Sequence, residues 1–233
     1  FRSEHLSSLD ELSGLEDAVQ PEDTLVLANS IGRLQKAVDC VRLDLAQRST
    51  AGSESLASAK RDLDRAGAGK AKLRREVDSL QSLLADNGIE STPVCDLLSL
   101  KDTAWQSVIE AYLGRNVDAL LVHEQGKETA AIDLYRRNRK DIFGAKLALG
   151  SRTRPWQAPG GGRYAAQLIE GEDKFAVRFL QGELGRVTLV ESSDQLKVGE
   201  KAISVDGMVS SGGGIDRLRL STATGLRIGG TSS

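Results

Sequence analysis

The stretch that decides the fold covers residues 88–114 and reads GIESTPVCDLLSLKDTAWQSVIEAYLG. Its first part is apolar and predicts an extended segment that starts at Pro93. Its second part predicts a helix that begins with Thr103 and Gln106 as a capping box. The apolar face of this helix consists of Trp105, Val108, Ile109, Tyr112 and Leu113. A strand followed by an amphipathic helix is typical of a domain that mixes strands and helices.

Beyond this stretch, short apolar strands continue to alternate with helices. Predicted strands cover residues 119–122, 145–149, 165–169, 186–190, 202–205 and 216–220, and predicted helices cover 127–140 and 172–181. This alternation favours a partly parallel sheet covered by helices. A loop rich in Gly and Pro interrupts it at residues 150–163. We therefore expect residues 87–233 to form one α/β (α+β) domain of two similar halves, about 87–150 and 163–225.

Upstream, residues 1–86 lack the material for a globular core, since only Phe1 of the nine aromatic residues lies there. Apolar residues instead recur in steps of four and three, which places them on one seam of a coiled helix. The first run is Leu27, Ile31, Leu34, Val38, Val41 and Leu45, and the second is Leu56, Ala59, Leu63, Ala66, Leu73, Val77, Leu80 and Leu84. The two runs differ in phase, so we expect one long coiled-coil arm with a break near residues 49–55, either a stutter or a non-helical break. A helical hairpin that turns at Gly52 is the alternative. No return heptad follows the α/β domain, and we expect the partner strand to lie largely outside this chain.

Composition excludes several classes of protein. The chain has 233 residues and carries 31 Lys and Arg against 33 Asp and Glu, a net charge of −2, so any nucleic-acid surface must be local. The two cysteines, Cys40 and Cys95, indicate a reducing compartment and no disulfide framework. No apolar run reaches the ~18 residues that a membrane span needs. We expect a cytoplasmic protein with no membrane partner.

Candidate catalytic and metal-binding residues are sparse. His5 lies in the arm, and His123 ends an apolar strand without a second ligand at a metal-binding spacing. Residues 66–71 lack the first Gly of a phosphate loop and the Ser or Thr that should follow its Lys. The glycines at 160–162 and 212–214 fit no dinucleotide fingerprint. The sequence therefore predicts no catalytic residue, no metal site and no cofactor.

A basic stretch lies between residues 136 and 163. The helix dipole favours cations at a helix end, but it accounts for only one or two of the eight. They are Arg136, Arg137, Arg139, Lys140, Lys146, Arg152, Arg154 and Arg163. We expect these side chains to bind the phosphates of double-stranded DNA without sequence preference.

Residues 88–114, with the strand at 119–122, resemble the first half of the hinge domain of SMC-type chromosome-organising ATPases. Hinges of that family show a glycine, a short strand, an amphipathic helix that ends in Leu-Gly, and an apolar strand. The segment 203–207 (ISVDG) and the turn at 211–214 (SGGG) are similar to the end of the second half of such hinges. The motifs PVCDL and WQSVIEAYLG are most similar to the branch that comprises MukB, MksB and JetC. JetC is the SMC-like ATPase of Wadjet plasmid-defence systems.

The resemblance implies a homodimerisation hinge that joins two coiled-coil arms of a DNA-organising, loop-extruding ATPase complex, in plasmid restriction or chromosome organisation. The ATPase heads, a kleisin and accessory subunits would belong to other parts of the full protein, and the complex would be associated with the nucleoid. Glycine-rich strand ends lie at the dimer contact in that family. By this matching, the dimer interface comprises Val205, Gly207, Ser210, Ser211, Gly212, Gly213 and Gly214. The basic stretch would face DNA that passes near the hinge.

Two other functions stay open on the sequence alone. A coiled-coil adaptor whose α/β head binds another protein would show the same heptads and the same domain pattern. An α/β enzyme domain that binds a nucleotide would need a phosphate loop or a cluster of titratable side chains, and the sequence offers neither.

Overall fold

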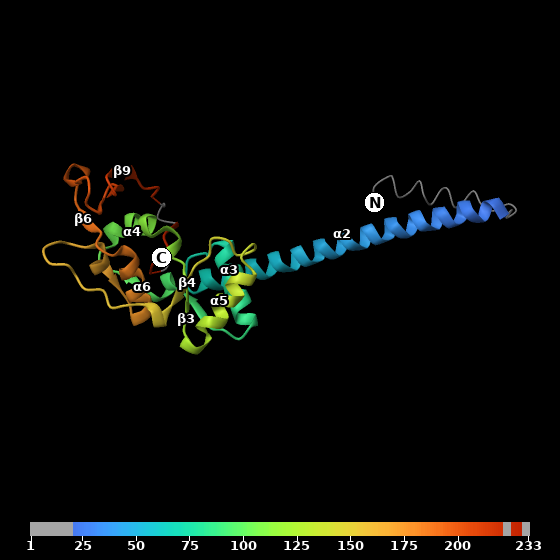
Figure 1. The fold of residues 1–233 in the computed structure, drawn as a ribbon, viewed down its shortest axis with the longest axis horizontal. Helices are drawn as coiled ribbons and strands as arrows, with labels where there is room; N and C mark the ends of the chain where they lie inside the picture. Colours follow the sequence, from blue (N-terminus) through green and yellow to red (C-terminus); the bar gives the residue numbers. More distant parts are fainter. Residues whose placement is uncertain (1–20, 221–224, 230–233) are drawn as a thin grey trace. The chain divides into compact units, whose positions relative to one another are not determined.

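The structure is a computed structural model, which describes residues 21–220 and 225–229. The chain divides into two compact units, residues 1–60 and residues 61–233 (Figure 1). The part of the predicted arm in residues 1–20 lies outside the described residues. In unit 1, the described element is the larger part of helix α2 (Pro21–Gly67).

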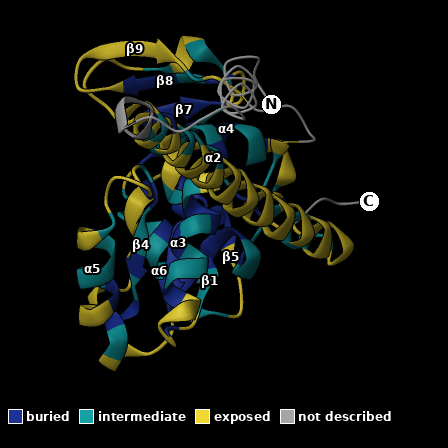
Figure 2. Ribbon diagram, turned by 90° about the vertical axis from the view of Figure 1, so that its right-hand side faces the viewer, coloured by how far each residue is buried: buried dark blue, intermediate teal, exposed yellow. Residues whose placement is uncertain are grey.

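Helix α2 leaves much of its apolar seam exposed in unit 1. The side chains of Leu45 and Leu56 are 60% and 73% exposed, and Figure 2 shows this helix exposed over most of its length. A helix of 47 residues spans about 70 Å. Because helices in water gain most of their stability by packing an apolar face, this seam has the character of one strand of a coiled coil.

A non-helical break at residues 49–55 is wrong, and so is the alternative turn at Gly52, because α2 is helical throughout this segment, which leaves the stutter. The Thr50 hydroxyl donates to the Ala46 carbonyl oxygen at 3.0 Å, and Arg48 pairs with Asp44 one turn earlier at 3.0 Å. A single Gly in a helix costs about 1 kcal/mol, which is too little to end a helix of this length. The change of heptad phase is therefore accommodated along a continuous helix.

The chain turns after Gly67 instead. Gly69 has φ of +68°, and the Lys70 N–H donates to the Arg65 carbonyl oxygen at 2.8 Å, a pattern in which a glycine closes a helix C-terminus. The Arg65 guanidinium pairs with both carboxylate oxygens of Asp96 at 2.8 Å, and the Asp96 side chain is only 3% exposed. The last turns of α2 are thereby fixed to the α/β part of unit 2.

Helix α3 (Arg75–Asp86) follows this turn and belongs to the α/β core. Its Leu80 and Leu84 side chains are fully buried, in one cluster with Leu120. The predicted boundary between residues 86 and 87 therefore falls inside a packed core, and the compact unit begins at Arg61. The heptad spacing assigned α3 to the coiled-coil arm because a helix that packs on a sheet shows the same apolar spacing as a coiled-coil strand.

The first half of the α/β part is a three-stranded sheet. Strand β1 (Ser91–Pro93) pairs antiparallel with β3 (Leu120–Val122), and β3 pairs parallel with β4 (Leu147–Leu149). Helix α4 (Gln106–Leu113) leads into β3, and α5 (Glu128–Arg137) connects β3 to β4. The predicted alternation of strands and helices is confirmed in this half.

Two local expectations in this half differ from the structure. Residues 94–97 form a 3₁₀ helix (η1), and strand β2 (Ser99–Leu100) is the extended part that follows. The cap at the start of the next helical segment is Asp102, whose Oδ1 accepts a hydrogen bond from the Ala104 N–H at 3.1 Å. Thr103 is already inside this segment and the Gln106 side chain donates to Glu110 and to the Ile228 carbonyl oxygen, so the predicted capping box of Thr103 and Gln106 is wrong.

The second half contains a four-stranded sheet of order β6-β7-β8-β9. Its strands are β6 (Thr188–Val190), β7 (Ala202–Ser204), β8 (Met208–Ser211) and β9 (Gly214–Arg217). Strands β6 and β7 are parallel, and β7, β8 and β9 are antiparallel neighbours. Strand β5 (Ile169–Glu170) and helix α6 (Lys174–Leu184) precede them. Residues 165–168, predicted as a strand, form a 3₁₀ helix instead.

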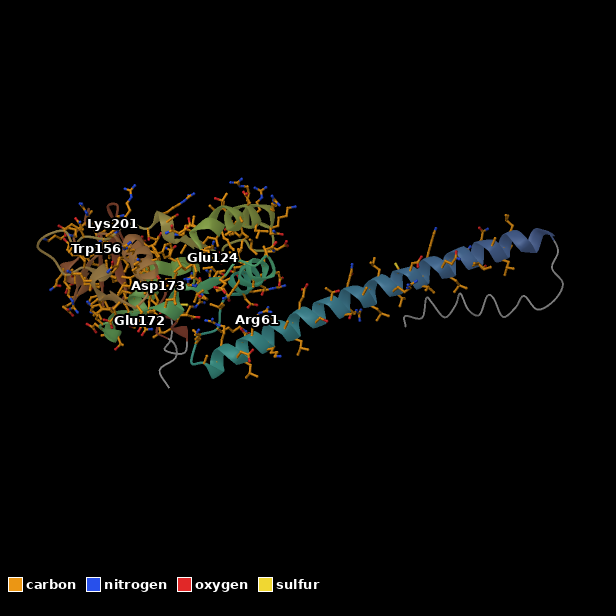
Figure 3. All side chains as sticks on the ribbon, turned by 90° about the horizontal axis from the view of Figure 1, so that it is seen from below. Arg61, Glu124, Trp156, Glu172, Asp173 and Lys201 are labelled. Carbon is orange, nitrogen blue, oxygen red and sulfur yellow. The ribbon has the colours of Figure 1, made fainter. Side chains whose placement is uncertain are left out.

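The two halves repeat one structural plan. Asp173 (Figure 3) caps α6 by accepting hydrogen bonds from the backbone N–H groups of residues 175 and 176, as Asp102 caps the equivalent segment. Both helices end at a glycine of nearly the same conformation, Gly114 with φ 54° and ψ −117°, and Gly185 with φ 57° and ψ −117°. Strands β2 and β5, one from each half, pair antiparallel. The prediction of two similar halves is confirmed.

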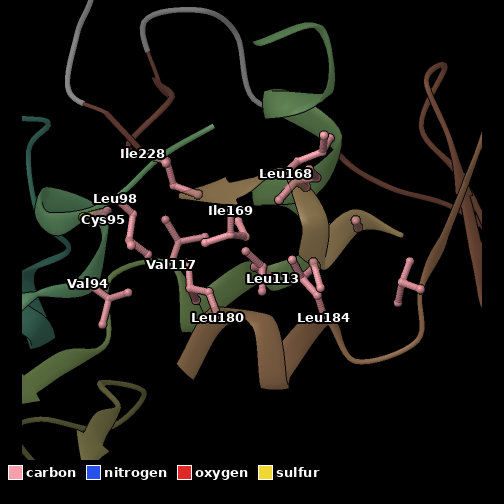
Figure 4. Packing of buried hydrophobic residues seen from close by; sticks show 14 of the residues in the cluster. Val94, Cys95, Leu98, Leu113, Val117, Leu168, Ile169, Leu180, Leu184 and Ile228 are labelled. Atoms are coloured by element: carbon pink, nitrogen blue, oxygen red, sulfur yellow. The ribbon is translucent and has the colours of Figure 1, made fainter. Parts of the chain in front are cut away.

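A shared hydrophobic core joins the halves (Figure 4). It includes Val94, Leu98, Leu113 and Val117 from the first half and Leu168, Ile169, Leu180 and Leu184 from the second. The chain approaches itself closely beside this core, because a Cβ on Gly171 would lie 2.4 Å from the Leu97 carbonyl oxygen and 2.7 Å from the Leu98 Cδ2 atom. A glycine is therefore required where the two halves meet.

A buried carboxylate connects both ends of the α/β part to its centre. The side chain of Asp118, just before β3, has no exposed surface. Arg74, in the turn before α3, donates to it through Nε at 2.8 Å and through a terminal nitrogen. Arg227, near the end of the described chain, pairs with the same carboxylate. The hydrogen bond to Asp118 raises the pKa of Arg74, so the ionised pair is favoured.

Glu110 of α4 holds the backbone next to Arg227. Its carboxylate is nearly buried and accepts hydrogen bonds from the N–H groups of Arg227 and Ile228 at 2.9 Å. Gln106 completes the contact by donating to the Ile228 carbonyl oxygen at 2.7 Å. Residues 225–229 are thus fixed to α4 by hydrogen bonds that the charge of Glu110 strengthens.

We predict that Gly171→Ala destabilises unit 2 by about 1–3 kcal/mol, because the added Cβ displaces backbone at residue 97. The control is Gly182→Ala in α6, where a Cβ meets nothing within 4 Å. It should stabilise the protein by about 0.5–1 kcal/mol, since Ala suits a helix better than Gly. Urea unfolding measures both, and equal midpoints for the two variants would contradict the close approach.

We predict that Asp118→Asn destabilises the protein by about 3–5 kcal/mol, because it leaves two guanidiniums without their buried partner. Asp141→Asn removes an exposed carboxylate and should change stability by less than about 0.5 kcal/mol. Chemical unfolding of both variants tests this difference, and a neutral effect of Asp118→Asn would show that the ion network is not needed for folding.

Candidate functional site

The β8–β9 hairpin carries most of the predicted interface residues. Gly212 and Gly213, at φ +59° and +101°, are the two central residues of its turn. A two-residue turn with positive φ at both positions suits the twist of a hairpin and strongly favours glycine. The backbone conformation of the turn therefore explains these glycines, in addition to any role at a dimer contact.

The turn between β7 and β8 is equally constrained. Gly207 has φ of +86°, and a Cβ there would lie 3.1 Å from the Leu220 side chain. The buried Ser204 hydroxyl accepts a hydrogen bond from the Met208 N–H at 3.1 Å and donates to Asp206, which lowers the pKa of Asp206. This turn fixes the start of the hairpin.

The predicted interface residues divide into two groups by burial. Gly207 and Ser210 are buried in this chain, and the Ser210 hydroxyl donates to the Lys197 carbonyl oxygen at 2.7 Å. Val205, Ser211 and residues 212–214 are exposed. The exposed group is available to a partner, whereas the buried pair supports the sheet from within. The assignment of all seven to a dimer interface stays a prediction.

Strand β9 is the open edge of the four-stranded sheet. It pairs with β8 on one side, and no strand in the described parts of the chain pairs with its other side. The Leu218 N–H donates to the Gly207 carbonyl oxygen at 2.8 Å, and bonded pairs alternate along an antiparallel ladder. The N–H groups of Ile215 and Arg217 therefore point away from β8. An edge of this kind can accept a further strand.

The eight cations predicted to contact DNA differ in their surroundings. Lys146 lies 2.9 Å from Glu183 and 5.4 Å from the centre of the Phe179 ring. Arg163 pairs with Asp102 at 2.8 Å and with Glu191 at 3.0 Å. These two cations connect elements of the fold, which the sequence did not reveal because their acidic partners are distant along the chain.

The remaining six cations are exposed, Arg152 and Arg154 in the loop that joins the halves. Arg136, Arg137, Arg139 and Lys140, here called the basic cluster, follow one another at the end of α5 and in the turn after it. Within the cluster, Arg136 forms an ion pair with Asp133 at 3.6 Å, between two exposed side chains. Such pairs contribute little, so the basic cluster keeps its positive charge for a ligand.

Sequence reasoning missed the network of Asp118, Glu110, Arg74 and Arg227. The signal was present, since Asp118 interrupts the apolar run from Val117 to Val122, and a charge at such a place is buried and must be paired. Its partners could not be found, because one precedes it by 44 residues and the other follows it by 109.

The described residues offer little for catalysis. Within 21–220 and 225–229, no group of three His, Cys, Asp or Glu side chains could hold a metal ion. His123 Nε2 lies 2.8 Å from the Thr92 hydroxyl oxygen, and burial raises the pKa of the Cys95 thiol far above its usual range. None of the helices described is both long enough and apolar enough to cross a membrane.

Comparison with known proteins gives a consistent result. Residues 90–195 match the family model described as the flexible hinge domain of SMC proteins, whereas no curated protein sequence matches the chain. The Pyrococcus furiosus Smc hinge domain with an extended coiled coil is similar at 20% identity, over 96% of this chain and 80% of that chain, with a TM-score of 0.50. An asymmetric dimer of the Geobacillus stearothermophilus SMC hinge domain is similar at 16% identity, over 76% and 75% of the two chains, with a TM-score of 0.52.

The match to the hinge model begins just before β1 and ends after β6, so it covers the whole first half and enters the second. The α/β part of the chain therefore has the fold of SMC hinge domains, and a long helix of coiled-coil character precedes it.

Proposed function

We propose that this chain is a self-association hinge, which dimerises through its α/β part and joins the coiled-coil arms of an SMC-like protein. The observation that carries the proposal is the open edge of β9 in a domain with the SMC hinge fold. The hinge of Geobacillus stearothermophilus, which has this fold, is described as a dimer. The chain acts as a connector in this proposal, and any ATPase activity belongs to heads elsewhere in the full protein.

The edge of β9 has the properties that strand addition requires. All four residues of β9 are exposed, and the outward N–H groups of Ile215 and Arg217 lack a partner strand. Ile215 adds an apolar side chain that is 45% exposed, and Val205 after β7 is 37% exposed. Main-chain hydrogen bonds supply affinity in such an interface, and flanking side chains supply specificity. A two-fold axis would let each subunit contribute the same surface.

The sharpest test removes one outward N–H and leaves the hairpin intact. We predict that Ile215→Pro weakens dimerisation at least about tenfold, because proline cannot donate to an added strand. The N–H of residue 215 does not bond β8, so the hairpin itself should persist. Ile215→Val keeps the N–H and a branched side chain, and it should dimerise like the wild type.

Sedimentation equilibrium over a range of concentrations measures both dissociation constants, and thermal unfolding checks that both variants are folded. A wild-type chain that stays monomeric at micromolar concentration would contradict the proposal and favour an adaptor that binds another protein. Equal dissociation constants for the proline and valine variants would place the interface away from β9.

We further propose that the basic cluster binds double-stranded DNA without sequence preference. Four exposed cations at the end of one helix are opposite in charge to the phosphate backbone of DNA. In the described structure, the ion pair in this group is the weak one between Arg136 and Asp133. No base-reading element accompanies them, so affinity should depend on salt and hardly on sequence.

We predict that replacing all four cluster residues with Gln abolishes binding to a duplex at moderate salt. Each phosphate contact contributes about 0.9 to the slope of log K against log salt, so the slope should fall by about 3 to 4. A matched control replaces four exposed cations of the second half, Lys174, Arg186, Lys197 and Lys201. Fluorescence anisotropy measures both, and equal losses in the two variants would show that net charge alone governs binding.

The finer assignment is also a proposal. The motifs PVCDL and WQSVIEAYLG support an SMC-like ATPase of the MukB, MksB and JetC branch, acting in plasmid restriction or chromosome organisation. The genes beside this one test it directly. A kleisin-like gene together with a topoisomerase-like nuclease gene would support plasmid defence, and their absence would count against it.

A further inference from the structure

We propose that unit 2 has a binding site for a small phosphorylated molecule, in a cavity surrounded by arginines next to the Asp118 network. This site is distinct from the β9 edge and from the basic cluster. The cavity has a volume of about 270 Å³. Four of its lining residues are Arg74, Arg115, Arg219 and Arg227, and Glu110 and Val117 also line it.

Arg74 and Arg227 are held in place on one side of the cavity. Both guanidiniums bond the buried carboxylate of Asp118, which fixes their orientation before any ligand arrives. Arg74 is saturated, since its other nitrogens reach Glu76 and the carbonyl oxygens of Gly144 and residue 115. Arg227 uses one terminal nitrogen on Asp118, and within the described chain its other side-chain N–H groups have no acceptor.

Arg115 and Arg219 are exposed arginines at the mouth of the cavity. Neither forms an ion pair within residues 21–220 and 225–229. Arg115 lies over the exposed Phe143 ring, 6.0 Å from its centre. They come from different parts of the chain, Arg115 from the turn after α4 and Arg219 from the segment after β9. An anion between them would connect the two halves.

The charge balance of the cavity favours an anion. Glu110 is occupied by the backbone N–H groups of residues 227 and 228 and by Gln106, and Asp118 is occupied by Arg74 and Arg227. With Glu76 included, the cavity and its surroundings contain four guanidiniums and three carboxylates. The surplus sits on Arg115, Arg219 and the unused side of Arg227, which are three separate donors around one space.

Phosphate fits this arrangement better than a carboxylate. A phosphate group accepts hydrogen bonds in several directions, whereas a carboxylate is planar and is satisfied by one fork of donors. Arginine is the residue that most often binds phosphate groups where the geometry of the contact matters. The volume suits inorganic phosphate, pyrophosphate or the phosphate end of a nucleotide, and it is too small to enclose a duplex.

The test titrates the whole chain with inorganic phosphate, pyrophosphate and ATP at constant ionic strength, by isothermal calorimetry. We expect saturable binding to at least one of the three, and the strongest of them identifies the source of the phosphate group. The double variant Arg115→Gln with Arg219→Gln should bind about tenfold more weakly or worse. Neither residue belongs to the Asp118 network, so the variant should fold. The control, Arg136→Gln with Arg137→Gln, should bind like the wild type.

A second measurement does not depend on any variant. During a phosphate titration of the wild type, the NMR signals of the arginine Nε–H groups of Arg115, Arg219 and Arg227 should shift, while those of Arg136 and Arg137 stay in place. Absence of saturable binding to all three probes would overturn the proposal. Equal phosphate binding by the double variant and the wild type would also overturn it. The proposal would fail as well if the double variant lowered the affinity for duplex DNA alone.

Discussion

Asp118 lies buried inside the α/β core, where two guanidiniums reach its carboxylate from segments far apart in the sequence. A buried carboxylate without partners would be costly enough to shift its protonation or to unfold the domain. Arg74 arrives from the turn that follows the long helix, and Arg227 arrives after the last strand. The folded domain therefore needs both ends of its chain in place at once. The pairing of Asp118 thus connects three segments: the turn after α2, the residues just before β3, and the end of the described chain.

The rest of the structure is arranged around that point. Glu110 holds the backbone beside Arg227, and Arg65 fixes the last turn of α2 through Asp96. The two repeated halves then share one core, with Gly171 permitting their close approach. The four-stranded sheet of the second half completes β6, β7 and β8 within the chain and leaves β9 with one side open. This open edge is the feature of the second half that a second copy could extend.

Much of the fold could be predicted from local patterns. The apolar face of α4, the glycine that ends it and the alternation of strands and helices are local properties, and the structure confirms them. A non-helical break in α2 was wrong because a change of heptad phase does not require a change of backbone conformation. The boundary at residue 86 was wrong because α3 shows the same spacing whether it faces a helix or a sheet.

The candidate sites were harder to predict, because their geometry depends on partners distant in the sequence. A run of basic residues was visible, but the ion pairs of Lys146 with Glu183 and of Arg163 with Asp102 were not. Glycines at 207 and 212–214 were visible, but the positive φ values of Gly207, Gly212 and Gly213 show that turns need these three whether or not a partner is present. The open edge of β9 could not be deduced, since it depends on the order of strands in the sheet.

The central claim is that a second copy adds to the β9 edge. Amide hydrogen exchange, followed residue by residue by NMR at protein concentrations above and below dimer dissociation, tests it most directly. We expect the Ile215 and Arg217 amides to exchange slowly in the dimer and fast in the monomer, while the Gly214 and Asp216 amides, which bond β8, change little. Equal exchange of Ile215 and Arg217 at both concentrations, in a chain that does dimerise, would contradict it.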